Sequence, residues 1–173
     1  MDIAAVNRFS CSVAEAFEML TDPEFLDRVA AASNPLRYGV SVDGLTATTT
    51  RIMASVSPID KFTGPEIELT DQIAWDPPAG DERTGTAQVA PTDLPLSLVG
   101  RVTLRADGAE SLLEYTGELT VSIPVVGHKL EALAAPLLLK GIEYQQQVAD
   151  EWLAEREGGP GGTSSQDPGT SPG

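Results

Sequence analysis

Cysteine and histidine are almost absent from this chain, which has one of each, Cys11 and His128. A single cysteine excludes an internal disulfide, and one cysteine with one histidine cannot supply the ligands of a zinc site. Cys11 precedes a predicted helix, where a thiolate would be favoured, but a small buried side chain is the simpler interpretation. His128 could act as a general base, yet the neighbouring sequence offers no obvious carboxylate to orient it. We therefore expect no metal, no cofactor and no catalytic histidine.

Basic residues are also scarce, at 11 Lys and Arg against 26 Asp and Glu, which gives a net charge of −15. They are scattered singly along the chain, so no basic cluster offsets the acidic surplus. Because such a molecule repels polyanions, we expect no nucleic-acid partner and no docking on an anionic membrane. Three acidic residues of one predicted loop, Asp76, Asp81 and Glu82, lack the spacing of a calcium loop and are expected to be solvated.

Long hydrophobic runs are missing too. The longest candidate, residues 133–139, is far shorter than the roughly 18 residues of a membrane-spanning helix. The first nine residues include an acidic position and no apolar core, so they are unlike a secretory signal. We expect a cytoplasmic protein without stable membrane insertion.

Glycine, proline, serine and threonine fill almost all of residues 158–173. Such a segment cannot bury enough apolar surface to offset the entropy lost on ordering, so we expect a disordered tail. The predicted folded domain is then residues 1–157.

Strand and helix signals alternate near the N-terminus. A short strand is predicted over residues 2–9. Ser12 and Glu15 then fit a capping box at the start of a helix, and Asp22 followed by Pro23 predicts the start of a second helix.

Residues 36–123 change to a period of two, which is typical of strands with one buried face. The pairs at 43–44 and 107–108 are both Asp-Gly, a tight-hairpin signal. Six strands are predicted in this region. The last segment, residues 128–155, carries a broad apolar stripe at helical spacing and predicts a long amphipathic helix. Pro136 lies inside it and should kink it or divide it in two.

The order strand, two helices, six strands, long helix, ending in IPVVGHKLEALAAPLLLKGIEYQQQVADEW, resembles the START-like superfamily, also called SRPBCC. This superfamily includes birch-pollen-allergen-like proteins, polyketide cyclases/dehydrases and lipid-transfer domains. The resemblance covers roughly residues 1 to 156 and is closest to an uncharacterised bacterial branch, a domain of unknown function. It implies an α+β helix-grip fold, in which a curved antiparallel sheet wraps around a long C-terminal helix and leaves a cavity. The superfamily has no shared catalytic residues to transfer.

Asp71 has the same parity as the apolar residues of its predicted strand, so a regular strand would point its carboxylate into the apolar face. Two interpretations follow. The carboxylate either orients a ligand or moves a proton in a cavity, or it escapes burial through a bulge, a strand end or a pair with an arginine. Gly141, in the middle of the long helix, together with Pro136 indicates a helix that is bent or closely approached, which would suit either a cavity lid or tight packing on the sheet.

Residues on the predicted inner faces form the candidate ligand-binding set: Tyr38, Ile52, Leu69, Asp71, Trp75, Leu98, Val102, Leu113, Tyr115, Leu133, Leu137 and Gly141. The hypothesis we favour is binding or sequestration of a small hydrophobic or amphipathic, lipid-like molecule between sheet and helix. The alternative is an enzyme of the cyclase or dehydratase type, with Asp71 or a tyrosine as the acid–base group. A third is an interaction module whose cavity is filled by side chains. The sequence does not give the oligomeric state.

Overall fold

The structure is a computed structural model that describes residues 1–158. Its elements follow the predicted order, with one addition, the four-residue helix α3. They are β1 (Asp2–Phe9), α1 (Val13–Leu20), α2 (Pro23–Ala32), β2 (Arg37–Asp43), β3 (Thr46–Ala54), α3 (Asp60–Thr63), β4 (Glu66–Trp75), β5 (Arg83–Pro91), β6 (Leu96–Asp107), β7 (Glu110–Val121) and α4 (Gly127–Glu157). The predicted tail, apart from Gly158, lies outside the described residues.

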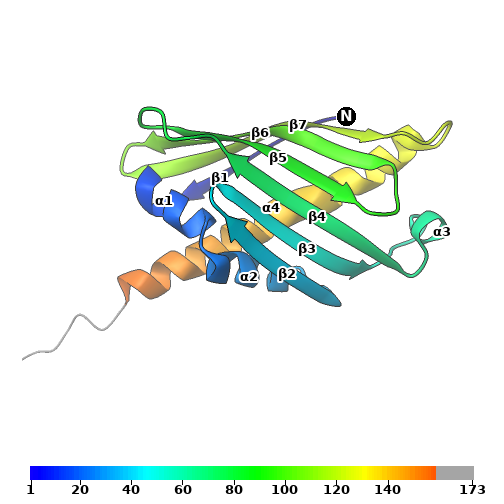
Figure 1. The fold of residues 1–173 in the computed structure, drawn as a ribbon, viewed down its shortest axis with the longest axis horizontal. Helices are drawn as coiled ribbons and strands as arrows, with labels where there is room; N and C mark the ends of the chain where they lie inside the picture. The colour runs from blue at the N-terminus through cyan, green and yellow to red at the C-terminus, as the bar shows by residue number, and fades with distance from the viewer. Residues whose placement is uncertain (159–173) are drawn as a thin grey trace, which may run out of the picture.

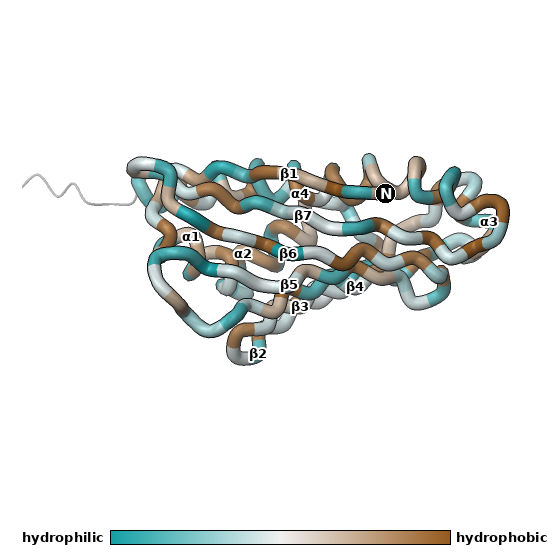
Figure 2. Tube along the Cα trace, turned by 90° about the horizontal axis from the view of Figure 1, so that it is seen from above, coloured by the Kyte–Doolittle hydropathy of each residue, from teal (hydrophilic) through white to brown (hydrophobic). Residues whose placement is uncertain are grey.

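All seven strands form one antiparallel sheet in the order β1-β7-β6-β5-β4-β3-β2. The sheet curves over α4, which packs against β1 and β7, while α2 packs against β2 and α4 at one end (Figure 1). Hydrophobic and hydrophilic segments alternate along β6 and β7, as strands with one buried face require (Figure 2). This architecture confirms the predicted α+β helix-grip fold.

The two short helices begin where the sequence predicts. Ser12 Oγ accepts a bond of 3.2 Å from the Glu15 backbone N–H, and Glu15 Oε2 accepts one of 2.9 Å from the Ser12 backbone N–H. Asp22 Oδ1 accepts a bond of 2.8 Å from the backbone N–H of Glu24, with Pro23 at the first helical position. Each cap satisfies backbone donors that a helix start leaves unpaired.

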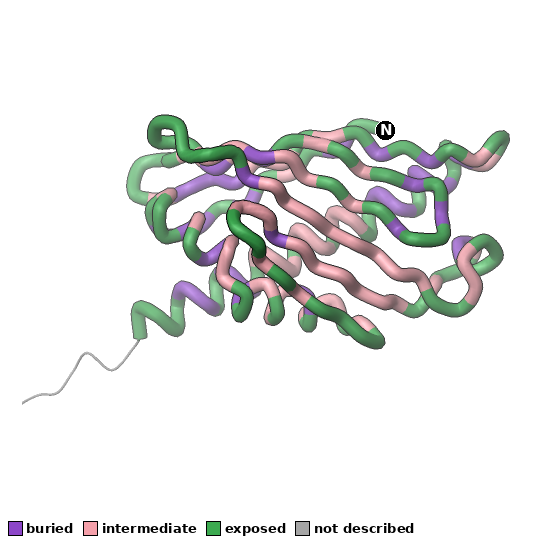
Figure 3. The backbone as a smooth tube through the Cα atoms, in the orientation of Figure 1, coloured by how far each residue is buried: buried purple, intermediate pink, exposed green. Residues whose placement is uncertain are grey.

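The core divides into two clusters along the length of α4. One lies under α1 and α2 and includes the fully buried Phe9, Phe25 and Leu113 together with Trp152. The other lies at the opposite end and includes Leu119 and the α4 residues Leu130 and Ala134. Between them, β3 and β4 are only half buried along most of their length (Figure 3). Their inner face therefore meets no dense packing there.

Pro136 does not divide α4, which is continuous over 31 residues. Of the two predicted outcomes, a kink or a division, the division is wrong for a local reason. Pro136 lies on the exposed face of the helix, and so does Ala132, whose carbonyl would otherwise accept the missing bond. Water can hydrate a carbonyl on that face, which lowers the free-energy cost of the missing hydrogen bond.

Among the described residues, no helix is both long and apolar enough to cross a bilayer.

Candidate functional site

A cavity of about 400 Å³ lies between the inner face of the sheet, α2 and the middle of α4. Its walls are mainly apolar. They come from alternate residues of β3 to β6 and from successive turns of α4, among them Met53, Ile67, Leu69, Ile73, Val89, Leu96, Leu98, Ala134, Leu137 and Leu138. Because strands point alternate residues to one face, the odd-numbered residues of β3 and β4 face the cavity together.

One ion pair lies on this apolar wall, between Arg51 of β3 and Asp71 of β4. The register pairs Arg51 with Leu69 and Thr49 with Asp71, so the two charged residues are diagonal neighbours on one face. Their side chains are 16 % and 25 % exposed, and burial lowers the pKa of Arg51. Among residues 1–158, no group accepts a hydrogen bond from the buried Arg51 Nε. Asp71 therefore faces the cavity, as the count along its strand predicts, and it also pairs with an arginine.

A second polar group lies where β7 meets α4. Gln145 Oε1 accepts one bond of 2.7 Å from the Tyr115 hydroxyl and another of 2.9 Å from Asn7 Nδ2. Asn7 Nδ2 also donates to the backbone carbonyl of Ile142, at 3.2 Å. Burial raises the pKa of Tyr115, although its bond to Gln145 opposes the shift. Because both donors fix the Gln145 amide, its Nε2 remains a donor on the cavity wall, with no acceptor among the described residues.

Six of the predicted ligand-binding residues line this cavity, and they come from four elements. They are Leu69, Asp71, Leu98, Tyr115, Leu137 and Gly141. Gly141 resolves a question that the sequence left open. A Cβ built there meets nothing within 4 Å, so the glycine faces open space and does not mark tight packing on the sheet.

The other six lie elsewhere. Val102 and Leu113 are fully buried core residues, and Trp75 packs edge-on against Phe17 at a centroid distance of 5.3 Å. Leu133 is 43 % exposed on the outer side of α4. Of the last two, Tyr38 of β2 is paired with Arg51, so it is on the predicted face but beyond the cavity lining, whereas Ile52 of β3 is on the opposite face.

Ile52 lies on the opposite face of its strand from the one that the sequence predicts. The cavity-facing residues of β3 are Ala47, Thr49, Arg51 and Met53, so Ile52 faces away from the cavity. The prediction placed Ile52 inside because it is more apolar than its neighbour Arg51. It fails because Arg51 forms an ion pair with Asp71 and can therefore face the cavity. Tyr38, on the edge strand β2, is 41 % exposed, and its hydroxyl donates to Asp27 Oδ2 at 3.2 Å.

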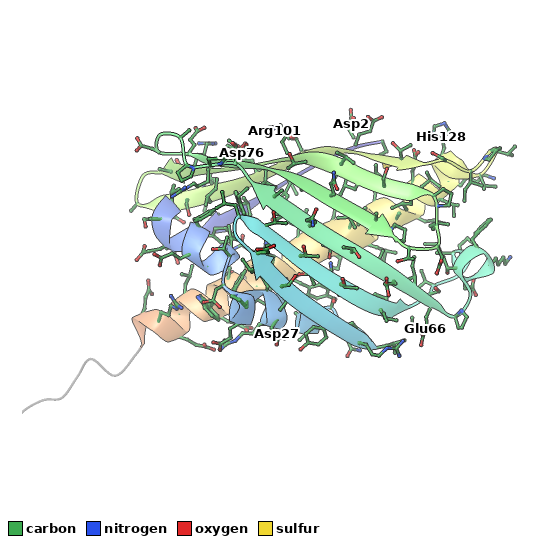
Figure 4. All side chains as sticks on the ribbon, in the orientation of Figure 1. Asp2, Asp27, Glu66, Asp76, Arg101 and His128 are labelled. Carbon is green, nitrogen blue, oxygen red and sulfur yellow. The ribbon has the colours of Figure 1, made fainter. Side chains whose placement is uncertain are left out.

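His128 is solvent-exposed at the start of α4 and points away from the sheet (Figure 4). A carboxylate does contact it, contrary to the expectation from sequence: Glu131 Oε2 lies 3.3 Å from its Nδ1. Glu131 also binds the backbone N–H of Val121, at 3.1 Å, so it belongs to the junction between β7 and α4 and lies outside the cavity lining.

Cys11 is buried, as the simpler interpretation of it predicted, and burial raises the pKa of its thiol. Asp76, Asp81 and Glu82 are exposed, and Asp76 accepts a bond of 2.6 Å from the Thr84 hydroxyl. No cluster of three or more metal-ligating side chains occurs in the part of the chain that the structure describes.

Solved structures from three organisms share this arrangement. The Zhui aromatase/cyclase from Streptomyces sp. R1128 is 10 % identical, with a TM-score of 0.59 over 94 % of this chain and 98 % of that one. Human STARD10 is 10 % identical, with a TM-score of 0.59 over 91 % and 66 %. A STAR-related lipid transfer protein from Xanthomonas axonopodis is 12 % identical, with a TM-score of 0.58 over 88 % and 85 %. The fold is therefore that of the START-like superfamily.

Residues 5–153 match the family described as "Protein of unknown function (DUF2505)". This match covers most of the chain, and the protein belongs to that family. No curated protein matches the sequence.

Proposed function

We propose that this protein binds a small amphipathic, lipid-like molecule in the cavity between the sheet and α4. The observation that carries the proposal is the cavity itself, about 400 Å³ with mainly apolar walls and few polar groups. Cavities of this size and lining are typical of sites for small apolar ligands, in which a few polar groups set the orientation. The START-like neighbours, which include a lipid transfer protein, support the same ligand class.

The polar groups favour a ligand whose polar end is uncharged. Arg51 and Asp71 neutralise each other, so an anionic or cationic group beside them would be repelled by one of the two. A hydroxyl can instead accept a bond from the arginine and donate one to the aspartate. The Gln145 amide supplies a further donor to the same cavity.

The same groups favour binding over acid–base catalysis by a cyclase or dehydratase. A general base or acid works best when its pKa lies near the operating pH. Burial raises the pKa of the Tyr115 phenol away from neutrality, and Asp71 is engaged by Arg51. A catalytic role would require the Arg51–Asp71 pair to separate when a substrate enters.

The experiment fills the cavity from Gly141 and measures binding of Nile red, a neutral dye that fluoresces in apolar surroundings. A Cβ at position 141 meets open space on the cavity wall, so we expect the Gly141→Phe side chain to extend into the cavity. The matched control is Gln147→Phe, at an exposed position of the same helix outside the cavity. We expect saturable binding with one site in the unmodified protein, loss of at least about tenfold in affinity for Gly141→Phe, and no change for the control. Equal affinities of all three proteins would refute the proposed site.

A further inference from the structure

The strand β2 ends the sheet, and no other strand lies beyond it (Figure 1, Figure 2). A strand at the edge of a sheet presents backbone N–H and C=O groups that can pair with a further strand. The alternation of hydrogen bonds identifies the residues that present them here. A bond of 2.9 Å from the Trp75 N–H to the Leu45 carbonyl shows that odd-numbered residues of β3 bond β4. The even-numbered residues of β3 therefore bond β2, and each is opposite an odd-numbered residue of β2.

The backbone groups of Tyr38, Val40 and Val42 consequently point away from the sheet. A bond of 2.8 Å from the Leu36 N–H to the Ile52 carbonyl agrees with this assignment, because it shows that an even-numbered residue of β3 directs its carbonyl to the β2 side. The middle of β2 has no proline and no charged side chain, which are common protections of an edge strand, and no residue of β2 is buried. This edge is therefore open to a further strand.

The opposite edge strand, β1, is protected by α4. Gln146 Oε1 accepts a bond of 2.8 Å from the Arg8 backbone N–H, and Gln146 Nε2 donates one of 2.7 Å to the Arg8 carbonyl. The helix that packs against β2 is α2, and its hydrogen bond to the strand comes from a side chain, the Tyr38 hydroxyl to Asp27 Oδ2. Among residues 1–158, no side chain bonds the outward backbone groups of β2 as Gln146 does for β1. The difference between the two edges points to a strand from outside the molecule at β2.

The sequence of β2, RYGVSVD, is complementary to itself in one antiparallel register, with Val40 at the centre. When Val40 is opposite Val40 of a second copy, all 7 residues of the strand overlap and Tyr38 is opposite Val42. Because these three residues carry the outward backbone groups, this register places them at the hydrogen-bonded positions of an antiparallel ladder. Their side chains share the inner face of β2, so the register also brings apolar and aromatic side chains together across the two strands.

The same register places Arg37 opposite Asp43 at both ends of the paired strands. These pairs fall at the non-hydrogen-bonded positions, where side chains of opposite strands are closest and opposite charges attract. Arg37 already contacts Glu66, from its Nη2 to Oε2 at 3.2 Å, and its side chain is 63 % exposed. Among the described residues its Nε and Nη1 have no acceptor, so the guanidinium can bond Glu66 and the Asp43 carboxylate of a second copy together.

We propose that two copies of this chain pair through β2 in this register, about a two-fold axis at Val40, and form one continuous sheet. The pairing goes beyond the proposed function and does not rest on it. The net charge of −15 on each copy opposes association, but exposed charges more than about 8 Å apart are largely screened at physiological salt. Because one pair of strands buries little surface, the dimer is weak and reversible, with a Kd of roughly 10 to 100 μM.

The test is sedimentation velocity of the full chain over roughly 5 to 500 μM, a range that brackets this Kd. Val40→Pro removes an outward N–H at the centre of the pairing and leaves the bonds from β2 to β3 in place. We expect a dimer of the unmodified protein that forms with rising concentration and is at least about tenfold weaker in Val40→Pro. The urea midpoint of this variant shows whether the fold is kept.

Two charge variants test the register without changing the backbone. Arg37→Glu and Asp43→Lys each place like charges opposite one another at both ends, so each alone should dimerise at least about tenfold more weakly. Mixed in equal amounts, they restore opposite charges at both ends, and we expect a mixed dimer about as tight as that of the unmodified protein. Native mass spectrometry identifies the mixed dimer by its mass. Asp93→Lys, at an exposed position between β5 and β6, is the matched control, since it changes the net charge as Asp43→Lys does and should not alter dimerisation.

An unmodified chain that stays monomeric over the whole range would overturn the pairing. A dimer that Val40→Pro and both charge variants leave intact would also overturn it, because such a dimer must use another surface. If the charge variants are weakened alone and their mixture stays monomeric, the register centred on Val40 is wrong.

Discussion

At the scale of single residues, the pair of Arg51 and Asp71 is the feature that makes the cavity more than an apolar gap. Each side chain alone would be a charge in an apolar wall, and each is tolerated because the other is present. In the proposed function the pair would also orient an amphipathic ligand, since the cavity wall is otherwise mainly apolar.

Removing one member of the pair should therefore cost stability. Asp71→Asn leaves the Arg51 charge without its partner, and we expect the free energy of unfolding to fall by about 2 kcal/mol, below the range for fully buried pairs because both side chains keep some exposure. The double substitution Arg51→Met with Asp71→Leu should recover most of that loss. Urea unfolding of the three proteins measures both effects. An Asp71→Asn protein as stable as the unmodified one would show that the pair is not a mutually dependent unit.

The alternation of side chains between the two faces of a strand explains which of these residues could be predicted from the sequence. Asp71 is found by counting in twos from Ile67 and Leu69, and the structure places it where that count predicts. Arg51 was missed because its strand is rich in threonine, so neither face is distinctly apolar and the side that faces the cavity is ambiguous. Gln145 lies on a helix among other glutamines, and only its contacts with Asn7 and Tyr115 distinguish it.

At the scale of elements, the junction between β7 and α4 positions the helix over the sheet. Gly127 is required there because a Cβ would lie 2.5 Å from the Val121 carbonyl oxygen. Glu131 then connects the first turn of α4 to the end of β7 by accepting the Val121 N–H. That hydrogen bond is the main cause that lowers the pKa of Glu131, with His128 and the N-terminal ammonium group contributing further.

The lowered pKa fixes the direction of a pH effect. A carboxyl whose pKa is lower in the folded than in the unfolded protein stabilises the fold above its unfolded pKa and loses this effect as the pH falls through the folded value. We expect Glu131→Gln to lower the urea midpoint at pH 7, and the difference from the unmodified protein to shrink as the pH falls below about 4. Unfolding curves between pH 3 and pH 7 test this. A difference that stays constant over that range would mean that the Glu131 charge does not contribute.

Element boundaries were largely predictable, and the exceptions are short or local. The helix caps at Ser12 and Asp22 and the Asp-Gly turns of two hairpins are local signals that span at most four residues. Contacts with distant parts of the chain do not change them, so they can be predicted from the sequence. The helix α3 has only four residues and no capping side chain, which leaves no pattern to detect. No local pattern distinguishes Glu131, because its partners in β7 and at the N-terminus are remote in the sequence.

At the scale of the whole molecule, two clusters of side chains pack between the sheet and the helices and leave a cavity beside them. Aromatic side chains fill one end, and α1, α2 and Trp152 meet there. Leu130, Ala134 and Leu119 fill the other end. The order of the elements predicts a sheet around a helix, but the cavity depends on the separation of the two layers, which no local pattern encodes. Hence half of the predicted ligand-binding residues belong to the packed core or to the exterior.

The central claim, that this cavity holds a lipid-like ligand, is tested most directly by native mass spectrometry after incubation with a total lipid extract of the expression host. We predict a discrete added mass at one ligand per chain, carried by the unmodified protein and by Gln147→Phe and missing from Gly141→Phe. A bare protein mass in all three, or the same adduct on Gly141→Phe as on the unmodified protein, would contradict the claim.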